Sequence, residues 1–176
     1  MFLAENRTTV DELLSLVNQR SMQIIILCLI SMVFCQMLKV IILSIRTKSF
    51  EIKPLFSTGG FPSSHTSTCI TLTVSLFLFQ MHDLNGMVDW SFAVAVIFSM
   101  IIIHDAMGVR YEASKHAKIL NHITSDIPAE QKKKIGFGKK LELKEMLGHK
   151  GVEVLGGVLV GLLVAVVGYF VLVNMI

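Results

Sequence analysis

The stretch MQIIILCLISMVFCQMLKVIILSI, residues 22–45, decides the class of this protein. It is apolar except for two glutamines, a few hydroxyl groups and one charged side chain, Lys39. A helix of about 20 predominantly apolar residues is long enough to cross the hydrocarbon core of a bilayer. The stretch therefore predicts a membrane-spanning helix that also reaches into the headgroup region.

The composition of the whole chain agrees with a membrane protein. Of its 176 residues, 53% are hydrophobic and 16% are charged, whereas an ordinary soluble domain has roughly 25% charged residues. Three cysteines are too few for a disulfide-knit secreted module. The basic residues are not interleaved with aromatic side chains, so we expect no nucleic-acid partner.

Three further apolar stretches follow the first one. The predicted spans lie at about 22–45, 64–81, 91–109 and 152–173. The Ser and Thr residues of the second span are expected to return hydrogen bonds to their own helix. Residues 1–20 have the charge pattern of an amphipathic helix, and the polar loop 110–150 is expected to be partly helical. We therefore expect an all-α integral membrane bundle with about four transmembrane helices, in one membrane domain, residues 1–176.

The basic residues predict the orientation of this bundle. The first connection carries Arg46, Lys48 and Lys53, and the loop 110–150 carries most of the other basic residues. Loops rich in Lys and Arg face the cytoplasm. The first and third connections are therefore predicted to lie on the cytoplasmic side of a cell or organelle membrane.

Several ionisable residues fall near one level of the predicted bundle, at its cytoplasmic end. They are Lys39, His65, Asp105, Arg110, His149 and Glu153. Ionisable groups inside a membrane boundary are costly and usually face a bundle interior or a wet cavity. Their shared depth predicts an anion site with acid and base groups, although Lys39 alone is equally well explained as a lysine whose amine reaches the headgroups.

The sequence Gly-Gly-Phe-Pro-Ser-Ser-His at 59–65 is typical of a helix start. Pro62 fits the first helical turn, and Ser63 or Ser64 can cap it. Backbone amides at a helix N-terminus attract anions, and His65 beside them could act as a general acid. The simpler alternative is a helix start without a chemical role.

In the sequence Gly-His-Lys-Gly-Val-Glu at 148–153, His149 stands four residues before Glu153. Residues at this spacing lie on the same face of a helix. A carboxylate on one imidazole nitrogen leaves the other nitrogen free to attack phosphorus. An interfacial histidine with a partner on the helix surface is the alternative. Asp105 is expected to pair with Arg110 or with Lys39 and hold it in position.

These motifs resemble a known signature. Lys39 and Arg46, Pro-Ser-Ser-His at 62–65, and His149 with Glu153 resemble the three-part signature of the type-2 phosphatidic acid phosphatase and vanadium haloperoxidase superfamily. The segments Gly-Gly-Phe-Pro-Ser-Ser-His-Thr-Ser, Asp-Ala-Met-Gly-Val-Arg and Leu-Gly-His-x-x-x-Glu-Val are similar to its divergent branch.

The resemblance implies a phosphatase that needs no metal or other cofactor and acts on a lipid phosphate monoester or diphosphate in the bilayer. It assigns roles to eight residues: His149 as the nucleophile that forms a phosphohistidine, Glu153 as its orienting group, His65 as the proton donor, and Lys39, Arg46, Ser63, Ser64 and Arg110 as phosphate ligands. Asp105 would support them through its expected pairing with Arg110 or Lys39. The runner-up is a catalytically inactive lipid- or protein-binding membrane module with the same fold. Homo-oligomerisation is left open.

The sequence departs from the superfamily signature at several positions. Ser64 replaces a glycine, Thr47 replaces a proline, and Glu153 replaces an aspartate. Leu143 stands where an arginine is expected, so Arg110 would have to serve from another helix. Arg110 and His116 have the arginine-to-histidine spacing of the signature, which makes His116 an alternative nucleophile.

Overall fold

The computed structural model describes residues 20–49, 59–125, 127–128, 131, 143 and 151–174. The helices in this part of the chain are α2 (Arg20–Thr47), α3 (Ser64–Asp83), α4 (Trp90–Met107), α5 (Val109–Ser125) and α7 (Gly151–Asn174). Four of them lie within two residues of the ranges that the apolar stretches indicate, and α5 begins the polar loop. The amphipathic helix expected over 1–20 falls almost wholly outside the described residues.

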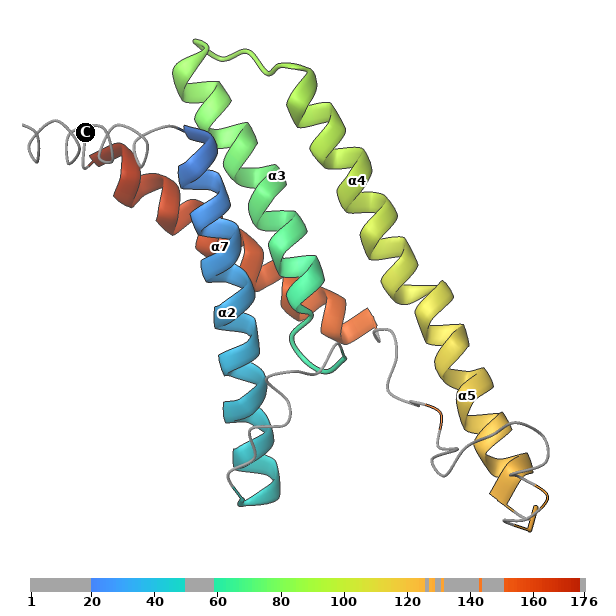
Figure 1. Ribbon diagram of the computed structural model, residues 1–176. Coiled ribbons are helices and arrows are strands. Elements are labelled where there is room, and N and C mark those ends of the chain that lie inside the picture. The colour runs from blue at the N-terminus through green and yellow to red at the C-terminus, as the bar shows by residue number, and fades with distance from the viewer. Residues whose placement is uncertain are drawn as a thin grey trace, which may run out of the picture.

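Helix α3 lies at the centre of the bundle and contacts α2, α4 and α7. Figure 1 shows α2 beside α3, α7 crossing behind both, and α4 running along the other side of α3. Helix α5 follows α4 after Gly108 and extends away from the other helices (Figure 1). The expected all-α membrane bundle is confirmed.

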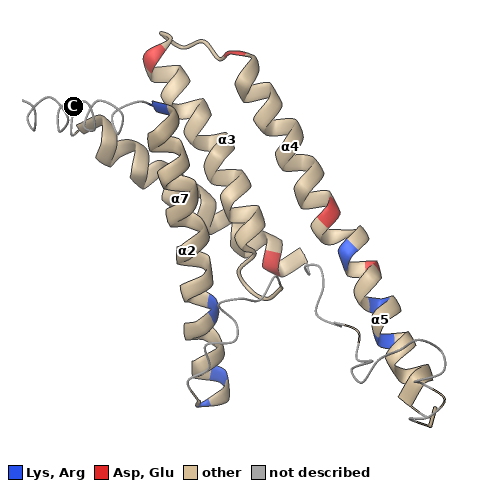
Figure 2. Cartoon of the chain, in the orientation of Figure 1, with Lys and Arg blue, Asp and Glu red and all other residues tan. Residues whose placement is uncertain are grey.

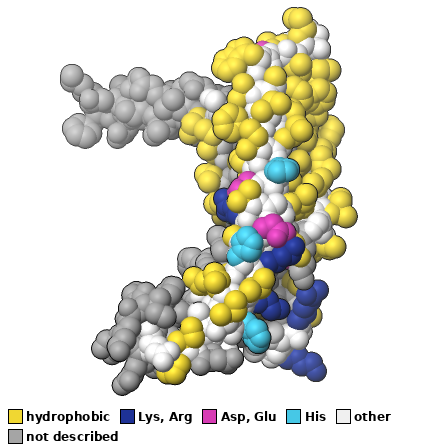
Figure 3. All heavy atoms as spheres, turned by 90° about the vertical axis from the view of Figure 1, so that its right-hand side faces the viewer, with side chains coloured by type: hydrophobic (Ala, Val, Ile, Leu, Met, Phe, Trp, Pro, Cys, Tyr) yellow, Lys and Arg dark blue, Asp and Glu magenta, His cyan; other side chains and the backbone are white. Residues whose placement is uncertain are grey.

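An uncharged band separates the two ends of the bundle. In Figure 2 the charged residues lie toward the ends of α2, α3 and α7, and α4 is uncharged until its last turns. The outer surface of this band is apolar, as the upper part of Figure 3 shows for the α4 side. Helices α2, α4 with α5, and α7 are each long and apolar enough to cross a membrane.

Helix α3 is less apolar than the other three because it carries many hydroxyl residues. It does not reach the hydropathy of a candidate span, although it has 20 residues. The hydroxyl groups face the neighbouring helices, and the buried ones are Ser64, Thr66, Ser67, Thr71 and Ser75. A helix with such a polar face fits the middle of a bundle better than a position against lipid.

The hydroxyl groups of α3 bond in two directions. Thr68 and Thr73 donate to carbonyls of their own helix, each at 2.9 Å, as the sequence predicts, and Thr73 also shares a hydrogen bond with Ser99 of α4 at 2.9 Å. Ser67 instead shares a hydrogen bond with Ser31 of α2, and Thr71 donates to the Ser31 hydroxyl at 2.9 Å. Thr71 also lies 3.2 Å from the carbonyl oxygen of Gly161 in α7. Side-chain hydrogen bonds therefore join α2, α3 and α7.

Glycines let α7 approach α3 closely. A Cβ atom at Gly157 would lie 2.5 Å from the carbonyl oxygen of Ser63, and one at Gly161 would lie 2.6 Å from that of Ser67. Both distances are shorter than any normal contact. Gly157 and Gly161 therefore lie on the surface of α7 that packs against α3.

Candidate functional site

The N-terminal end of α3 is built by a capping serine. The Ser63 hydroxyl accepts the Thr66 backbone N–H at 3.3 Å and the Thr66 hydroxyl at 2.9 Å. Ser63 itself is fully buried and has extended backbone angles, as an N-cap residue should. The prediction that Ser63 caps a helix is confirmed.

This helix end is fixed to the first turns of α7. The Ser63 backbone N–H donates to the carbonyl oxygen of Glu153 at 2.9 Å. The Phe61 ring lies against Gly156, where a Cβ would come within 2.4 Å of it. The start of α3 and the start of α7 are therefore in direct contact, so the backbone holds Glu153 beside the Pro-Ser-Ser-His segment.

Lys39 of α2 joins the same group of residues. It is only 4% exposed, and its Nζ donates to the Ser64 hydroxyl at 3.5 Å. Glu153 is close enough to interact with Lys39 electrostatically. This contact favours a lysine held inside the bundle over one whose amine reaches the headgroups. We call Lys39, Ser63, Ser64 and Glu153 the lysine cluster.

His65 and Cys35 lie next to the lysine cluster. His65 follows Ser64 in the first turn of α3 and is half-buried. The Cys35 thiol is buried and donates to the Ser63 carbonyl at 3.9 Å. Nothing in the sequence pattern marks Cys35 as part of the site, although Cys35 precedes Lys39 by about one helical turn and so shares its face.

Arg110 and Asp105 pair with each other on the α4–α5 helix. Arg110 Nε donates to Asp105 Oδ2 at 2.7 Å, and the two side chains are 49% and 38% exposed. Of the two partners expected for Asp105, the structure thus places Arg110 beside it. Figure 3 shows this charged region below the apolar surface.

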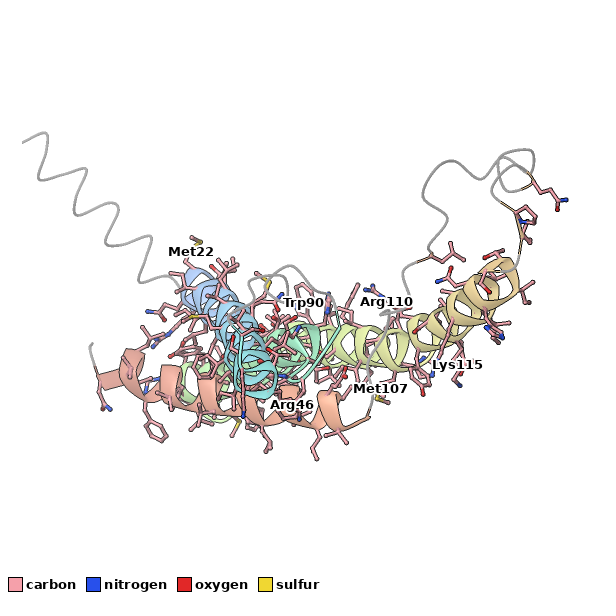
Figure 4. All side chains as sticks on the ribbon, turned by 90° about the horizontal axis from the view of Figure 1, so that it is seen from below. Met22, Arg46, Trp90, Met107, Arg110 and Lys115 are labelled. Atoms are coloured by element: carbon pink, nitrogen blue, oxygen red, sulfur yellow. The ribbon has the colours of Figure 1, made fainter. Side chains whose placement is uncertain are left out.

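Arg46 and Arg110 do not meet. Arg46 is exposed in the last turn of α2, about 10 Å along the axis beyond Lys39. Figure 4, a view from below, shows Arg46 on α2 and Arg110 on the α4–α5 helix, and the two side chains do not point toward each other. The contacts described for Lys39 and for Arg110 form two separate groups on different helices.

His149 lies outside the described residues, four positions before Glu153 in the sequence. Among the residues that the structure does describe, no three His, Cys, Asp or Glu side chains are grouped as they would be to hold a metal ion. The chemistry available in the lysine cluster is that of a buried cation, hydroxyl groups and a helix N-terminus, all of which suit an anion.

Comparisons with known proteins agree with this arrangement. A family model described as "Divergent PAP2 family" matches residues 20–164. The "Uncharacterized membrane protein YuiD" of Bacillus subtilis (strain 168) is 35% identical over 149 residues, which cover 81% of this chain and 91% of that protein. No solved structure matches significantly. The resemblance to the divergent branch is confirmed, and the chain is an integral membrane protein that belongs to the Divergent PAP2 family.

Proposed function

We propose that this protein is a membrane phosphatase that hydrolyses a lipid phosphate monoester or diphosphate through a phosphohistidine intermediate. The observation that carries the proposal is the buried Lys39, whose Nζ lies 3.5 Å from Ser64 Oγ at the N-terminal end of α3. A buried cation is costly unless it has partners or a ligand of opposite charge. A phosphoryl group is such a ligand.

The lysine cluster offers three kinds of phosphate contact. The Lys39 ammonium supplies positive charge, the Ser64 hydroxyl supplies a hydrogen bond, and the first turn of α3 supplies backbone amides and the positive end of the helix dipole. Phosphoryl transfer depends mainly on positioning and on stabilising charge in the transition state. Arg46 and Arg110 are proposed to add phosphate contacts when substrate is bound.

The proposed reaction has two steps. His149 attacks phosphorus, a P–N bond forms, the P–O bond to the lipid breaks, and His65 gives a proton to the leaving oxygen. Water then attacks the phosphohistidine, His65 takes its proton, and inorganic phosphate leaves. Glu153 orients His149 and stabilises its positive charge. This sequence of steps needs no metal.

The uncharged band suggests how a lipid would reach the site. The lysine cluster lies toward one end of this band, close to the level where α2 and α7 become polar. A lipid phosphate could keep its tail in the bilayer while its headgroup reaches Lys39. We propose that this end faces the cytoplasm, as the basic loops predict.

Phosphate release from purified protein in mixed micelles tests the proposal. The panel contains phosphatidic acid, phosphatidylglycerophosphate and a prenyl diphosphate. We expect His149→Ala and His65→Ala to reduce release to background and Lys39→Met to reduce it at least about 100-fold. His122→Ala is the matched control, because His122 is an exposed histidine of α5 outside the proposed site.

Two outcomes would change the assignment. Equal background from the wild type and the variants would reject the phosphatase and favour the lipid- or protein-binding module. Full activity in His149→Ala combined with loss in His116→Ala would move the nucleophile to His116, the residue six positions after Arg110.

A further inference from the structure

Gln36 of α2 carries a buried oxygen atom that no other side chain of the bundle satisfies. The residue is half-buried, and its Oε1 atom is buried and accepts no hydrogen bond from any described residue. The other glutamine of α2, Gln23, does have a partner, because its Oε1 accepts from Arg20 Nη1 at 3.0 Å. Since buried polar groups are nearly always hydrogen-bonded, the Gln36 oxygen points to a ligand that donates a hydrogen bond.

Gln36 is also a neighbour of the lysine cluster. It precedes Lys39 by three residues on α2, a spacing at which two side chains of one helix lie next to each other. Two other buried oxygens lack a partner in the described part of the chain, those of Ser44 and Ser75. Ser44 is five residues past Lys39, on another face of α2, and Ser75 is eleven residues past Ser64 along α3.

Gln36 lies deeper in the membrane than Lys39. Three residues of helix correspond to about 4.5 Å along the axis and about 60° of rotation. Beyond Lys39, α2 leads out of the uncharged band to the exposed Arg46, so Gln36 is on the side of Lys39 toward the bilayer interior. When Lys39 holds the phosphate of a lipid, the atoms between that phosphate and the tail therefore come beside Gln36.

The same face of α2 continues into side chains that face lipid. Met32, Leu29 and Ile25 precede Gln36 by four, seven and eleven residues, which is the spacing of one helix face. These three side chains are 41%, 53% and 50% exposed. A lipid can thus lie along one face of α2, with its phosphate at Lys39, its linking atoms at Gln36 and its tail on apolar side chains.

We propose that Gln36 is a specificity residue that accepts a hydrogen bond from a hydroxyl group lying a few atoms from the substrate phosphate. The proposal rests on the proposed phosphatase function and narrows its substrate class. Phosphatidylglycerophosphate has such a hydroxyl, on its phosphorylated glycerol. Phosphatidic acid and prenyl diphosphates have no hydroxyl outside their phosphate groups. A substrate without the hydroxyl leaves the buried carboxamide unpaired, and the site discriminates against it for that reason.

Two substrates that differ in a single hydroxyl provide the test. They are 1-acylglycerol 3-phosphate and the corresponding 3-acyloxypropyl phosphate, with the same tail and the same phosphate. We expect kcat/KM of the wild type to favour the first substrate at least about 10-fold, and Gln36→Met, which keeps the length of the side chain, to reduce this preference to less than about 2-fold. Both rates are measured on the same protein, so their ratio does not depend on how much of a variant folds.

Gln23→Met is the matched control, because it makes the same change at the opposite end of α2. This variant should keep the wild-type preference. A wild type that treats the two substrates alike would overturn the proposal. A Gln36→Met protein that keeps the wild-type preference, or that loses both activities completely, would also overturn it.

Binding of the same two lipids to the wild type and Gln36→Met, measured by native mass spectrometry from micelles, separates this proposal from the proposed function. Tighter binding of the hydroxylated lipid that depends on Gln36, without phosphate release from any lipid, would reject the phosphatase and keep the role of Gln36. Phosphate release with equal affinities and equal kcat/KM for both lipids would reject the role of Gln36 and keep the phosphatase.

Discussion

The helices α2, α3 and α7 are held together differently from the arm formed by α4 and α5. In the first group, buried hydroxyl groups cross between helices and two glycines of α7 lie against backbone carbonyls of α3. The arm packs mainly on α3 through α4 and carries the exposed Asp105–Arg110 pair where α4 meets α5. The lysine cluster belongs to the first group, and Arg110 belongs to the arm.

This difference follows from the physics of helix packing in a bilayer. Lipid tails are as apolar as leucine side chains, so helices associate through close packing and hydrogen bonds and gain little from the hydrophobic effect. The first group has both kinds of contact. Ser99 of α4 bonds the Thr73 hydroxyl at 2.9 Å and the Cys69 carbonyl oxygen at 3.2 Å, but α4 has no glycine that would bring its backbone as close to α3.

Gly157→Ala should give the largest loss of stability. The new Cβ would lie 2.5 Å from the Ser63 carbonyl oxygen, and a backbone atom cannot move aside as a flexible side chain can. We expect the free energy of unfolding in mixed micelles to fall by about 3 kcal/mol. Gly151→Ala is the matched control, because a Cβ there meets nothing within 4 Å. Equal stability of the two variants would show that α3 and α7 do not pack this closely.

Thr71→Val should have a smaller effect on the same group of helices. The substitution keeps the branched shape but removes the hydroxyl that donates to Ser31 at 2.9 Å. The free energy of unfolding should fall by about 1 to 2 kcal/mol. Thr68→Val is a useful comparison, since the Thr68 hydroxyl donates to its own helix at the Ser64 carbonyl oxygen. A larger loss in Thr68→Val would contradict the view that bonds between helices hold this group together.

Arg20→Gln should cost less, about 0.5 to 1 kcal/mol, because it removes a half-exposed ion pair at the opposite end of α2 and α3. Arg20 donates to both carboxylate oxygens of Asp83, at 2.8 and 3.2 Å. The effect is measured as the unfolding free energy at pH 7. Glu112→Gln in the arm is the reference for an exposed pair.

The same ion pair predicts a pH dependence. Asp83 lies beyond the apolar part of α3; desolvation raises the pKa of its carboxyl, but hydrogen bonds from Arg20 and His82 outweigh this and lower the pKa below 3.8. Because the folded-state pKa is depressed, the stabilisation is present above pH 3.8 and is lost as the pH falls through the folded-state pKa. Unfolding curves of the wild type and Arg20→Gln should therefore converge in acid, and a constant difference would disprove the linkage.

Glu112→Gln in α5 should have the smallest effect. Glu112 accepts a hydrogen bond from Lys115 at 2.7 Å, but both side chains are more than half exposed. Exposed pairs of this kind often contribute nothing measurable. The unfolding midpoint should stay within experimental error of the wild type. A clear loss of stability would mean that the arm is held by more than its local contacts.

Much of the fold could be predicted from the sequence because helix bounds are set locally. Apolar length and the capping Ser63 place four helices within two residues of the predicted ranges. The central position of α3 was not predicted. It depends on which hydroxyls turn toward other helices, and the chain around Ser67 and Thr71 looks no different from that around Thr68, which bonds to its own helix.

The sequence predicts how deep in the membrane the residues of the candidate site lie, but not how they are arranged across the bundle. Counting residues along each span puts Lys39, Asp105, Arg110 and Glu153 toward one end of the bundle. It cannot show that α4 leads away from α2, so that the Asp105–Arg110 pair and the contact of Lys39 with Ser64 form two separate groups. That separation depends on how the helices cross, which the pattern of one helix does not specify.

The lipid-facing length of α2 has a consequence for the choice of bilayer. Because Lys39 is buried inside the bundle, the lipid-facing surface of α2 extends from Arg20 to Arg46, with 25 residues between them, or about 38 Å of helix. This is longer than the roughly 30 Å of an average hydrocarbon core, and a helix accommodates such an excess by tilting. Reconstitution into lipids of decreasing chain length should therefore increase the tilt of α2.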